Sequence, residues 1–212
     1  MTKPLFQSYR PTPSLEGAYA RVGRARQHLR NLKRQVTGLS RSTARPSVSV
    51  AAGTTGVFWD VTNEIPSVIP ILAGETIYNL RAALDYLVYE LAFLDSEQMQ
   101  EKTQFPIEDS PKQWRKHGRR LQGLSNEHTE AVKGLQPFSG CEWTAVLRDI
   151  SNPDKHRHLV AAYPGARVPV AKEVVHEPAL QMLFEDGRPV IETLRGLCER
   201  VSEVLDQFIA DF

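Results

Sequence analysis

The stretch of residues 71–95 sets the strongest limit on what this 212-residue chain can fold into. Its apolar residues recur at alternating steps of three and four, which places them along one stripe of an α-helix. They are Ala73, Ile77, Leu80, Leu84, Leu87, Leu91 and Leu94. Because a stripe of this length must be buried against other elements, we expect a central helix around which the rest of the chain packs.

A second line of side chains runs beside this stripe. Tyr78, Arg81, Asp85 and Tyr89 follow one another at steps of three, four and four residues, so they stack along one edge of the helix. Arg81 and Asp85 also have the spacing at which a guanidinium and a carboxylate can pair. We interpret them either as a structural ion pair at a helix-packing boundary or as the support of a third polar group from elsewhere in the chain.

The flanking segments predict more helices and a few strands. Amphipathic patterns indicate helices over 15–39 and 190–208, and capping residues indicate shorter ones that begin near 110, 125 and 139. The polar segment 38–46 is interpreted as a connector. Segments rich in β-branched and aromatic residues predict one small antiparallel sheet, with strands near 47, 57, 159, 168 and 180.

The predicted fold class is therefore α+β, a helix-dominated bundle with a small sheet. A chain of this length buries enough surface for one large domain. We expect a single domain over residues 1–212, in which 1–45 form a basic helical arm and 46–212 form the core.

Charge is distributed very unevenly along the chain. Residues 1–45 hold ten Lys or Arg and one acid, Glu16, whereas the remaining residues hold sixteen bases and twenty-four acids. A chain with such opposed ends suits a polyanion, an acidic partner or its own acidic half. The candidate nucleic-acid-binding residues of the arm are Arg21, Arg24, Arg30 and Arg34.

A second basic segment surrounds Trp114. Its candidate nucleic-acid-binding residues are Arg115, Lys116, Arg119 and Arg120. Basic residues interleaved with an aromatic ring can follow a phosphate backbone and stack a base. The alternative is a solvated helix face with Trp114 tucked inward.

The densest polar cluster follows Arg148 and carries the only candidate chemistry. Pro153 is expected to end or restart the helix, so that several side chains converge on one helix end. His156 would act as general acid or base, Arg148 and Arg157 would hold a phosphate, and Asp154 would flank the histidine. Lys155, Arg81 and Asp85 would support this group. The alternative is a buried polar network in which Asp85 pairs with Lys155, His156 or Arg157.

Several classes of protein lack support in the sequence. There is no P-loop, no dinucleotide-binding glycine motif and no GxSxG motif. Asp154, His156 and His158 alternate without the spacing of a metal site, so we expect neither a metal nor another cofactor. The start lacks the apolar core of a signal peptide, no run is long enough to span a membrane, and two cysteines suit a reducing compartment. We therefore expect a cytoplasmic protein with no membrane partner.

Four segments together resemble a broad group of bacterial and phage-associated proteins of no assigned activity. The segments are GETIYNLRAALDYLVYEL, TQFPIED, GLQPF and LRDISNPDKHRHLV, and the shared features are an NLRxxLD helix, an FPI segment and a DKHR motif. The resemblance covers most of residues 70–160. It implies one coherent domain and carries no reaction with it.

More loosely, the bundle with its basic surface is similar to HEPN-type ribonucleases, whose signature is Arg, four to six residues, then His at a helix end. This chain departs from that signature, since seven residues separate Arg148 from His156 and three separate Arg24 from His28. The likeness implies a ribonuclease and does not decide the function.

Three functional hypotheses follow. The leading one is a nucleic-acid-associated protein, with RNA favoured over DNA, that carries a metal-independent ribonuclease-like site at the DKHR segment. The alternative is a non-enzymatic protein that forms homo-oligomers by pairing its basic N-terminal helix with its acidic C-terminal helix. The third is a small-molecule pocket between the sheet and the central helix, lined by Trp59, Tyr78 and Tyr89.

Overall fold

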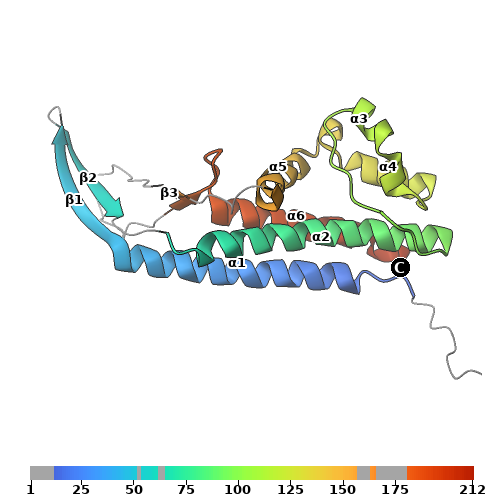
Figure 1. Cartoon of the computed structure of the whole chain (residues 1–212), viewed down its shortest axis with the longest axis horizontal. Coiled ribbons are helices and arrows are strands. Elements are labelled where there is room, and N and C mark those ends of the chain that lie inside the picture. Colours follow the sequence, from blue (N-terminus) through green and yellow to red (C-terminus); the bar gives the residue numbers. More distant parts are fainter. Residues whose placement is uncertain (1–11, 52–53, 62–64, 157–162, 166–180) are drawn as a thin grey trace, which may run out of the picture.

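The computed structural model describes residues 12–51, 54–61, 65–156, 163–165 and 181–212, and it describes side chains outside 40–64 and 152–181. Its framework is three long helices that lie side by side, α1 (Glu16–Thr43), α2 (Val68–Ser96) and α6 (Val190–Phe208) (Figure 1). A fourth helix, α5 (Glu142–His156), packs against α2 and α6. The predicted helix-dominated architecture is confirmed.

Short elements connect and end these helices. The chain passes from α2 to α5 through α3 (Pro111–Lys116), η1 (Gly118–Leu121), α4 (Asn126–Gly134) and η2 (Pro137–Ser139), and it closes with η3 (Ile209–Asp211). Ser110 and Ser125 cap α3 and α4, because their hydroxyls accept the backbone N–H groups of Gln113 and His128. None of the described helices is long and apolar enough to cross a membrane.

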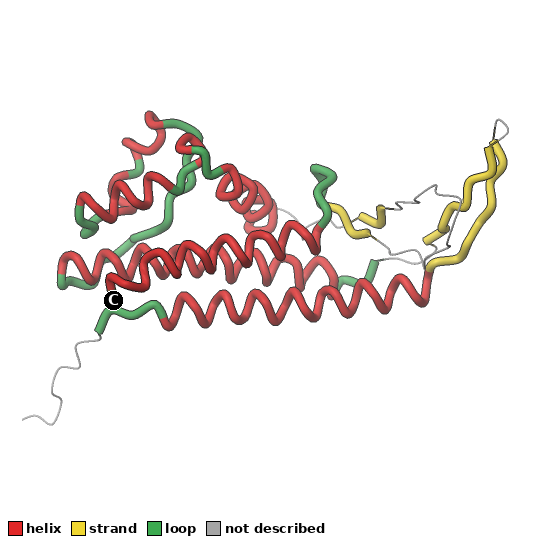
Figure 2. The backbone as a smooth tube through the Cα atoms, turned by 180° about the vertical axis from the view of Figure 1, so that it is seen from behind, coloured by secondary structure: helices red, strands yellow, loops and turns green. Residues whose placement is uncertain are grey.

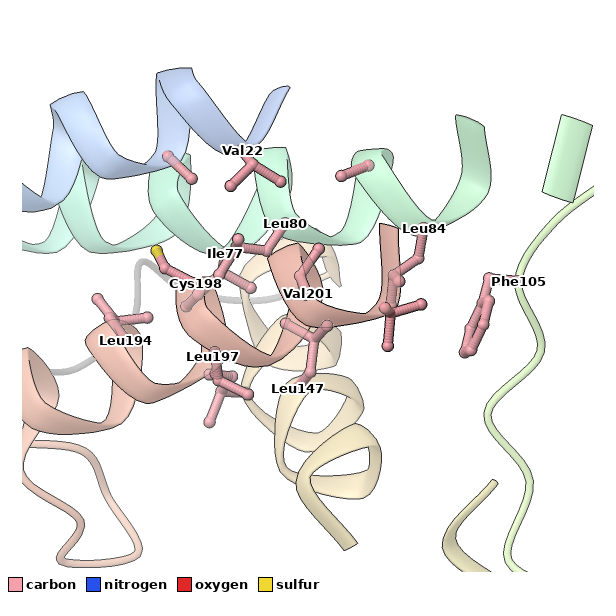
Figure 3. Close-up of a cluster of buried hydrophobic side chains, with 14 of the residues drawn as sticks. Val22, Ile77, Leu80, Leu84, Phe105, Leu147, Leu194, Leu197, Cys198 and Val201 are labelled. Atoms are coloured by element: carbon pink, nitrogen blue, oxygen red, sulfur yellow. The ribbon is translucent and has the colours of Figure 1, made fainter. Parts of the chain in front are cut away.

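The core lies where α2 faces α1, α5 and α6. The predicted stripe of α2 is buried except for Leu94, which is half-buried. Figure 3 shows side chains from all four helices meeting there, among them Val22, Ile77, Leu80, Leu147, Leu194 and Val201. The apolar seam expected on residues 15–39 is also buried, apart from the partly buried Leu29. Helical periodicity therefore predicted the packing of α1 and α2 correctly.

The connector expected over residues 38–46 is wrong. α1 continues to Thr43 and leads directly into β1 (Ala44–Ala51). Gly38 and the serines that follow it weaken a helix by at most about 1 kcal/mol each. Because Leu39 is buried at the end of the seam, its packing carries the helix past them.

The single small antiparallel sheet is not supported. β1 pairs with β2 (Thr54–Val61), with Ala44 opposite Val61, and β3 (Tyr163–Gly165) pairs separately with β4 (Gln181–Leu183). Since α1 runs into β1 without a loop, the first pair is carried beyond the end of the helices (Figure 2). The expected strands near 159 and 168 lie outside the described residues.

Pro153 does not end α5, contrary to expectation. The helix runs through it to His156. A proline lacks the N–H that would reach the carbonyl four residues back, here that of Asp149. With only one further turn of helix to follow, this loss is confined to the end of α5.

Arg81 and Asp85 hold the extended segment that follows α2. Arg81 Nη2 donates to the Phe105 carbonyl at 2.6 Å and to Asp85 Oδ1 at 3.3 Å. Asp85 Oδ1 also accepts the Phe105 N–H at 2.9 Å. The Phe105 ring is fully buried. The two side chains thus bind both backbone groups of one residue, which we call the Phe105 clamp. The four-residue spacing of Arg81 and Asp85 allows this pairing, and the pair has a structural role.

Asp85→Ala is expected to lower the free energy of unfolding by about 2–4 kcal/mol, because the buried Arg81 loses its carboxylate and the Phe105 N–H loses an acceptor. Urea denaturation followed by circular dichroism measures this. Glu101→Ala removes an exposed carboxylate and should change the value by less than about 0.5 kcal/mol. Equal unfolding midpoints for the two variants would show that the clamp does not stabilise the fold.

The two cysteines should differ sharply in reactivity. Burial raises the pKa of Cys198 to about 11; Arg26 lowers it and Glu199 raises it further. Cys141 is only half-buried. At about pH 8 we expect a thiol-specific reagent to label one thiol in the native protein and the second only in denaturant. Cys141→Ser should remove the fast reaction, and two fast native thiols would contradict the burial of Cys198.

Candidate functional site

The outer side of α1 carries a set of exposed cations. Arg24, Arg30, Lys33 and Arg34, here called the α1 basic face, all reach solvent. Arg24 donates to Gln27 and Arg34 to Asn31, both neutral groups of α1 itself. Among the described residues, no carboxylate lies within 4 Å of these four side chains. The face is therefore positively charged and open to an anionic ligand.

Arg21, the remaining candidate on α1, faces α2. Its guanidinium lies over the rings of Tyr78 and Tyr86, 5.9 and 5.4 Å from their centroids, and donates to Asn79 Oδ1 at 3.4 Å. The hydrogen bond to the Tyr86 hydroxyl raises the pKa of Arg21. Arg21 thus joins α1 to α2 and is only half-buried.

The second basic segment lies on the opposite side of α2 from α1 (Figures 1 and 2). Arg115, Lys116 and Arg119 are exposed, whereas Arg120 pairs with Glu108. Trp114 is half-buried, with its ring edge-on to Phe138 at 6.3 Å between centroids. The partly buried position of Trp114 fits the alternative, a solvated helix face with this ring turned inward. The predicted nucleic-acid-binding residues therefore form two separate surfaces.

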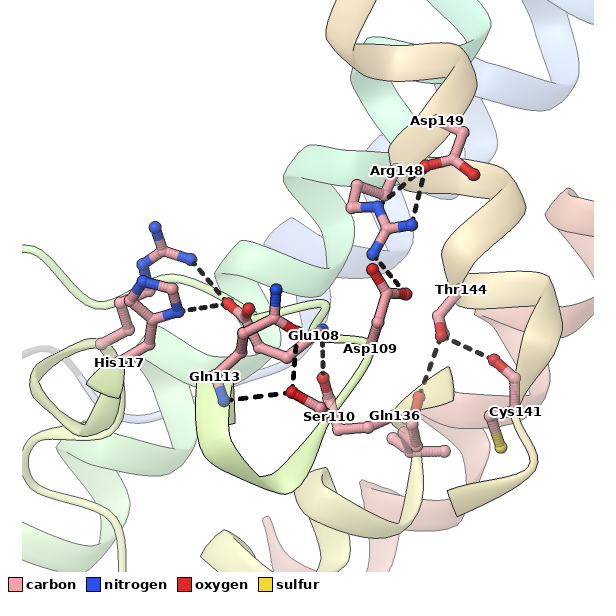
Figure 4. Close-up of polar contacts among 12 residues, drawn as sticks. Glu108, Asp109, Ser110, Gln113, His117, Gln136, Cys141, Thr144, Arg148 and Asp149 are labelled. Atoms are coloured by element: carbon pink, nitrogen blue, oxygen red, sulfur yellow. Dashed lines mark hydrogen bonds and ion pairs between the residues drawn. The ribbon is translucent and has the colours of Figure 1, made fainter. Parts of the chain in front are cut away.

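A buried carboxylate, Glu108, organises a polar cluster that the sequence did not reveal (Figure 4). Its side chain is 8% exposed; Oε1 lies 2.5 Å from His117 Nδ1 and 3.4 Å from Arg120 Nη1. The Glu108 N–H donates to Gln136 Oε1 at 3.0 Å. His117 and Arg120 are only nine and twelve residues from Glu108 in the sequence. Their spacing does not show that the carboxylate between them is buried.

Arg148 is held by two carboxylates next to this cluster. Its Nη1 donates to Asp109 Oδ1 at 2.7 Å and its Nε to Asp149 Oδ1 at 2.8 Å (Figure 4). Burial alone would lower the pKa of Arg148, but the hydrogen bonds to Asp149 and Asp109 outweigh burial and hold the pKa above its usual value. Its charge is therefore largely matched within the chain.

The rest of the predicted catalytic group lies beyond the described side chains. Asp154, Lys155 and His156 belong to the last turn of α5, and only their backbone is described. Arg157 and His158 lie outside the described residues, as does the side chain of Trp59. Arg148 and His156 are eight residues apart on one helix, roughly 12 Å along its axis. The catalytic grouping stays a prediction.

His128 is a second histidine that the sequence did not single out. His128 Nδ1 lies 2.8 Å from Asp95 Oδ2, and its Nε2 lies 3.5 Å from Asp211 Oδ2. Asp95 Oδ2 also accepts the Ser125 N–H at 2.6 Å. These contacts tie the end of α2 to α4 and to the last residues of the chain, so His128 has a structural role. Within the described part of the chain, no cluster of His, Cys, Asp or Glu could hold a metal ion.

The neighbouring acids Glu108 and Asp109 give a matched stability test. Glu108→Ala should lower the free energy of unfolding by about 2–4 kcal/mol, since His117 and Arg120 lose a buried partner. Asp109→Ala removes a carboxylate whose side chain is 57% exposed and should cost less than about 1 kcal/mol. Thermal and urea denaturation measure both values. Equal costs would contradict the buried cluster.

Comparisons with models of known protein families, with curated proteins and with solved structures found no match.

Proposed function

We propose that the protein binds nucleic acid through the phosphate backbone, with RNA favoured over DNA, and that the α1 basic face makes the main contact. The observation that carries this proposal is the set of exposed cations on α1 without a described carboxylate within reach. Phosphate contacts by Lys and Arg supply most of the affinity in sequence-independent binding. Arg115, Lys116 and Arg119 offer a second, weaker surface.

The catalytic part of the proposal assigns RNA cleavage to His156, with Arg148, Asp154 and Arg157. It is supported by the composition of the cluster and by the position of Asp154 and His156 at the end of the helix that carries Arg148. Arg148 is already matched by Asp109 and Asp149, which makes it a poor phosphate ligand. The described contacts thus favour binding over catalysis.

The alternative function is a homo-oligomer in which acidic side chains of a second copy cover the α1 basic face. Glu192, Glu199 and Glu203 are exposed on α6, which favours this alternative. Within one chain, α1 and α6 pack through their apolar sides, and Tyr19 donates to Asp206 at 2.6 Å. Among the described residues, that contact leaves the α1 basic face without an acidic partner, and the alternative takes that partner from a second copy.

Binding of a fluorescent single-stranded RNA at several salt concentrations tests the proposal. The variant Arg30→Gln/Lys33→Gln/Arg34→Gln should bind at least about tenfold more weakly near 100 mM salt, and its log–log salt slope should fall by about 2. The matched control, Lys133→Gln/Arg195→Gln/Arg200→Gln, removes the same charge from other surfaces and should bind nearly as the parent does.

Absence of binding at low salt, or equal losses in the two variants, would overturn the assignment. Cleavage followed in the same samples, with His156→Ala as the comparison, tests the catalytic part. Light scattering tests the alternative: a dimer that the α1 variant dissociates would favour oligomerisation over RNA binding.

A further inference from the structure

Four large apolar side chains are exposed on one side of α2. Val68, Ile71, Tyr78 and Tyr86 fall within about 80° of one another at 100° per residue. The rings are the most prominent, since Tyr78 is 52% exposed and Tyr86 39%. Exposed aromatic rings gathered on one helix face indicate a contact surface.

Contacts with α1 fix the two rings. Arg21 lies over both and hydrogen-bonds the Tyr86 hydroxyl at 3.5 Å. A Cβ atom at Gly17 would approach the Tyr86 ring to 2.9 Å, so the ring lies directly against the α1 backbone. Each ring is therefore held from the α1 side while a large part of it stays in solvent. Rings held in this way lose little freedom when a ligand stacks on them.

The rings lie beside one end of the α1 basic face, at Arg24. Arg24 follows Arg21 by one helical turn and is exposed. Arg34 and Arg30 lie about 80° and 120° around α1 from Arg24, on the side away from the rings. Glu75 is the exposed acid on this side of α2, between Ile71 and Tyr78. Since Glu75 repels phosphate, an anionic chain is expected to cross at Tyr78 and Tyr86 and to avoid Ile71.

We propose that the ligand is single-stranded nucleic acid, whose bases stack on Tyr78 and Tyr86 while its phosphates contact Arg24 and continue over the outer surface of α1 toward Arg34 and Arg30. This inference rests on the proposed nucleic-acid binding and names the form of the polymer. Aromatic rings beside a positive groove are the usual means of holding unpaired strands, because every base has a face that can stack. A duplex keeps its base faces buried and offers only its phosphates.

The test compares one fluorescent RNA, alone and annealed to its complement, at fixed salt. Tyr78→Leu/Tyr86→Leu keeps the apolar bulk and removes the rings; it should weaken binding of the single strand at least about tenfold and binding of the duplex less than about twofold. Its salt slope should match that of the parent, since no phosphate contact is lost. Tyr78→Phe/Tyr86→Phe keeps the rings and should lose less than about threefold.

Met99→Ala, a change at an exposed apolar residue elsewhere, serves as the control, and melting curves confirm that each variant is folded. Unchanged single-strand binding in the leucine variant, with binding still lost in the Arg30→Gln/Lys33→Gln/Arg34→Gln variant, would overturn stacking and leave the proposed function standing. Absence of RNA binding in the parent would overturn both the stacking and the proposed function. A parent dimer that the leucine variant converts to a monomer would assign the rings to a second copy and overturn the inference.

Discussion

The Phe105 clamp is the constraint on which the polar half of the structure depends. Burial lowers the pKa of Arg81, and Asp85 counters that effect. A guanidinium in such a place must be compensated, and here the compensation is a backbone carbonyl from another segment. Since Phe105 is fixed against α2, the residues directly after it are fixed as well. Glu108 then meets Gln136, His117 and Arg120, and Asp109 meets Arg148.

The helices that form this framework were largely predictable, because a buried stripe repeats within one segment and needs no knowledge of its partner. Residues 71–95 and 15–39 show this, and nearly all of their apolar positions are buried. The errors came from local breakers. Gly38 costs a helix about 1 kcal/mol, which the burial of Leu39 offsets. Proline costs about 3 kcal/mol in a helix interior, but Pro153 lies in the last turn of α5, where few backbone hydrogen bonds remain to be lost. A local sequence pattern does not show whether burial elsewhere in the fold offsets the cost of such a residue.

The candidate site was predictable only where the described contacts of a side chain stay within its own helix. The cations of α1 stay exposed, as a run of charges on one helix face suggests. Arg148 is paired with Asp109, thirty-nine residues away in the sequence. Arg21 is packed against two tyrosines of α2. The sequence supplied the residues but not these distances. It consequently assigned Arg21 to phosphate binding and Arg148 to catalysis, where the structure gives both of them partners within the chain.

In the described part of the chain, folding does not pair the exposed cations of α1 with carboxylates. α1 packs on α2 and α6 through apolar side chains, and Arg26, Arg30 and Arg34 follow one another at four-residue steps on its exposed surface. Like charges at that spacing repel by a few tenths of a kcal/mol per pair. Among the described residues no carboxylate offsets this repulsion, whereas the phosphates of a polyanion would. Two exposed rings lie at the edge of this surface, beside Arg21 and Arg24. The surface of α1 and α2 is therefore suited to a charged, stacking polymer more than to a neutral partner.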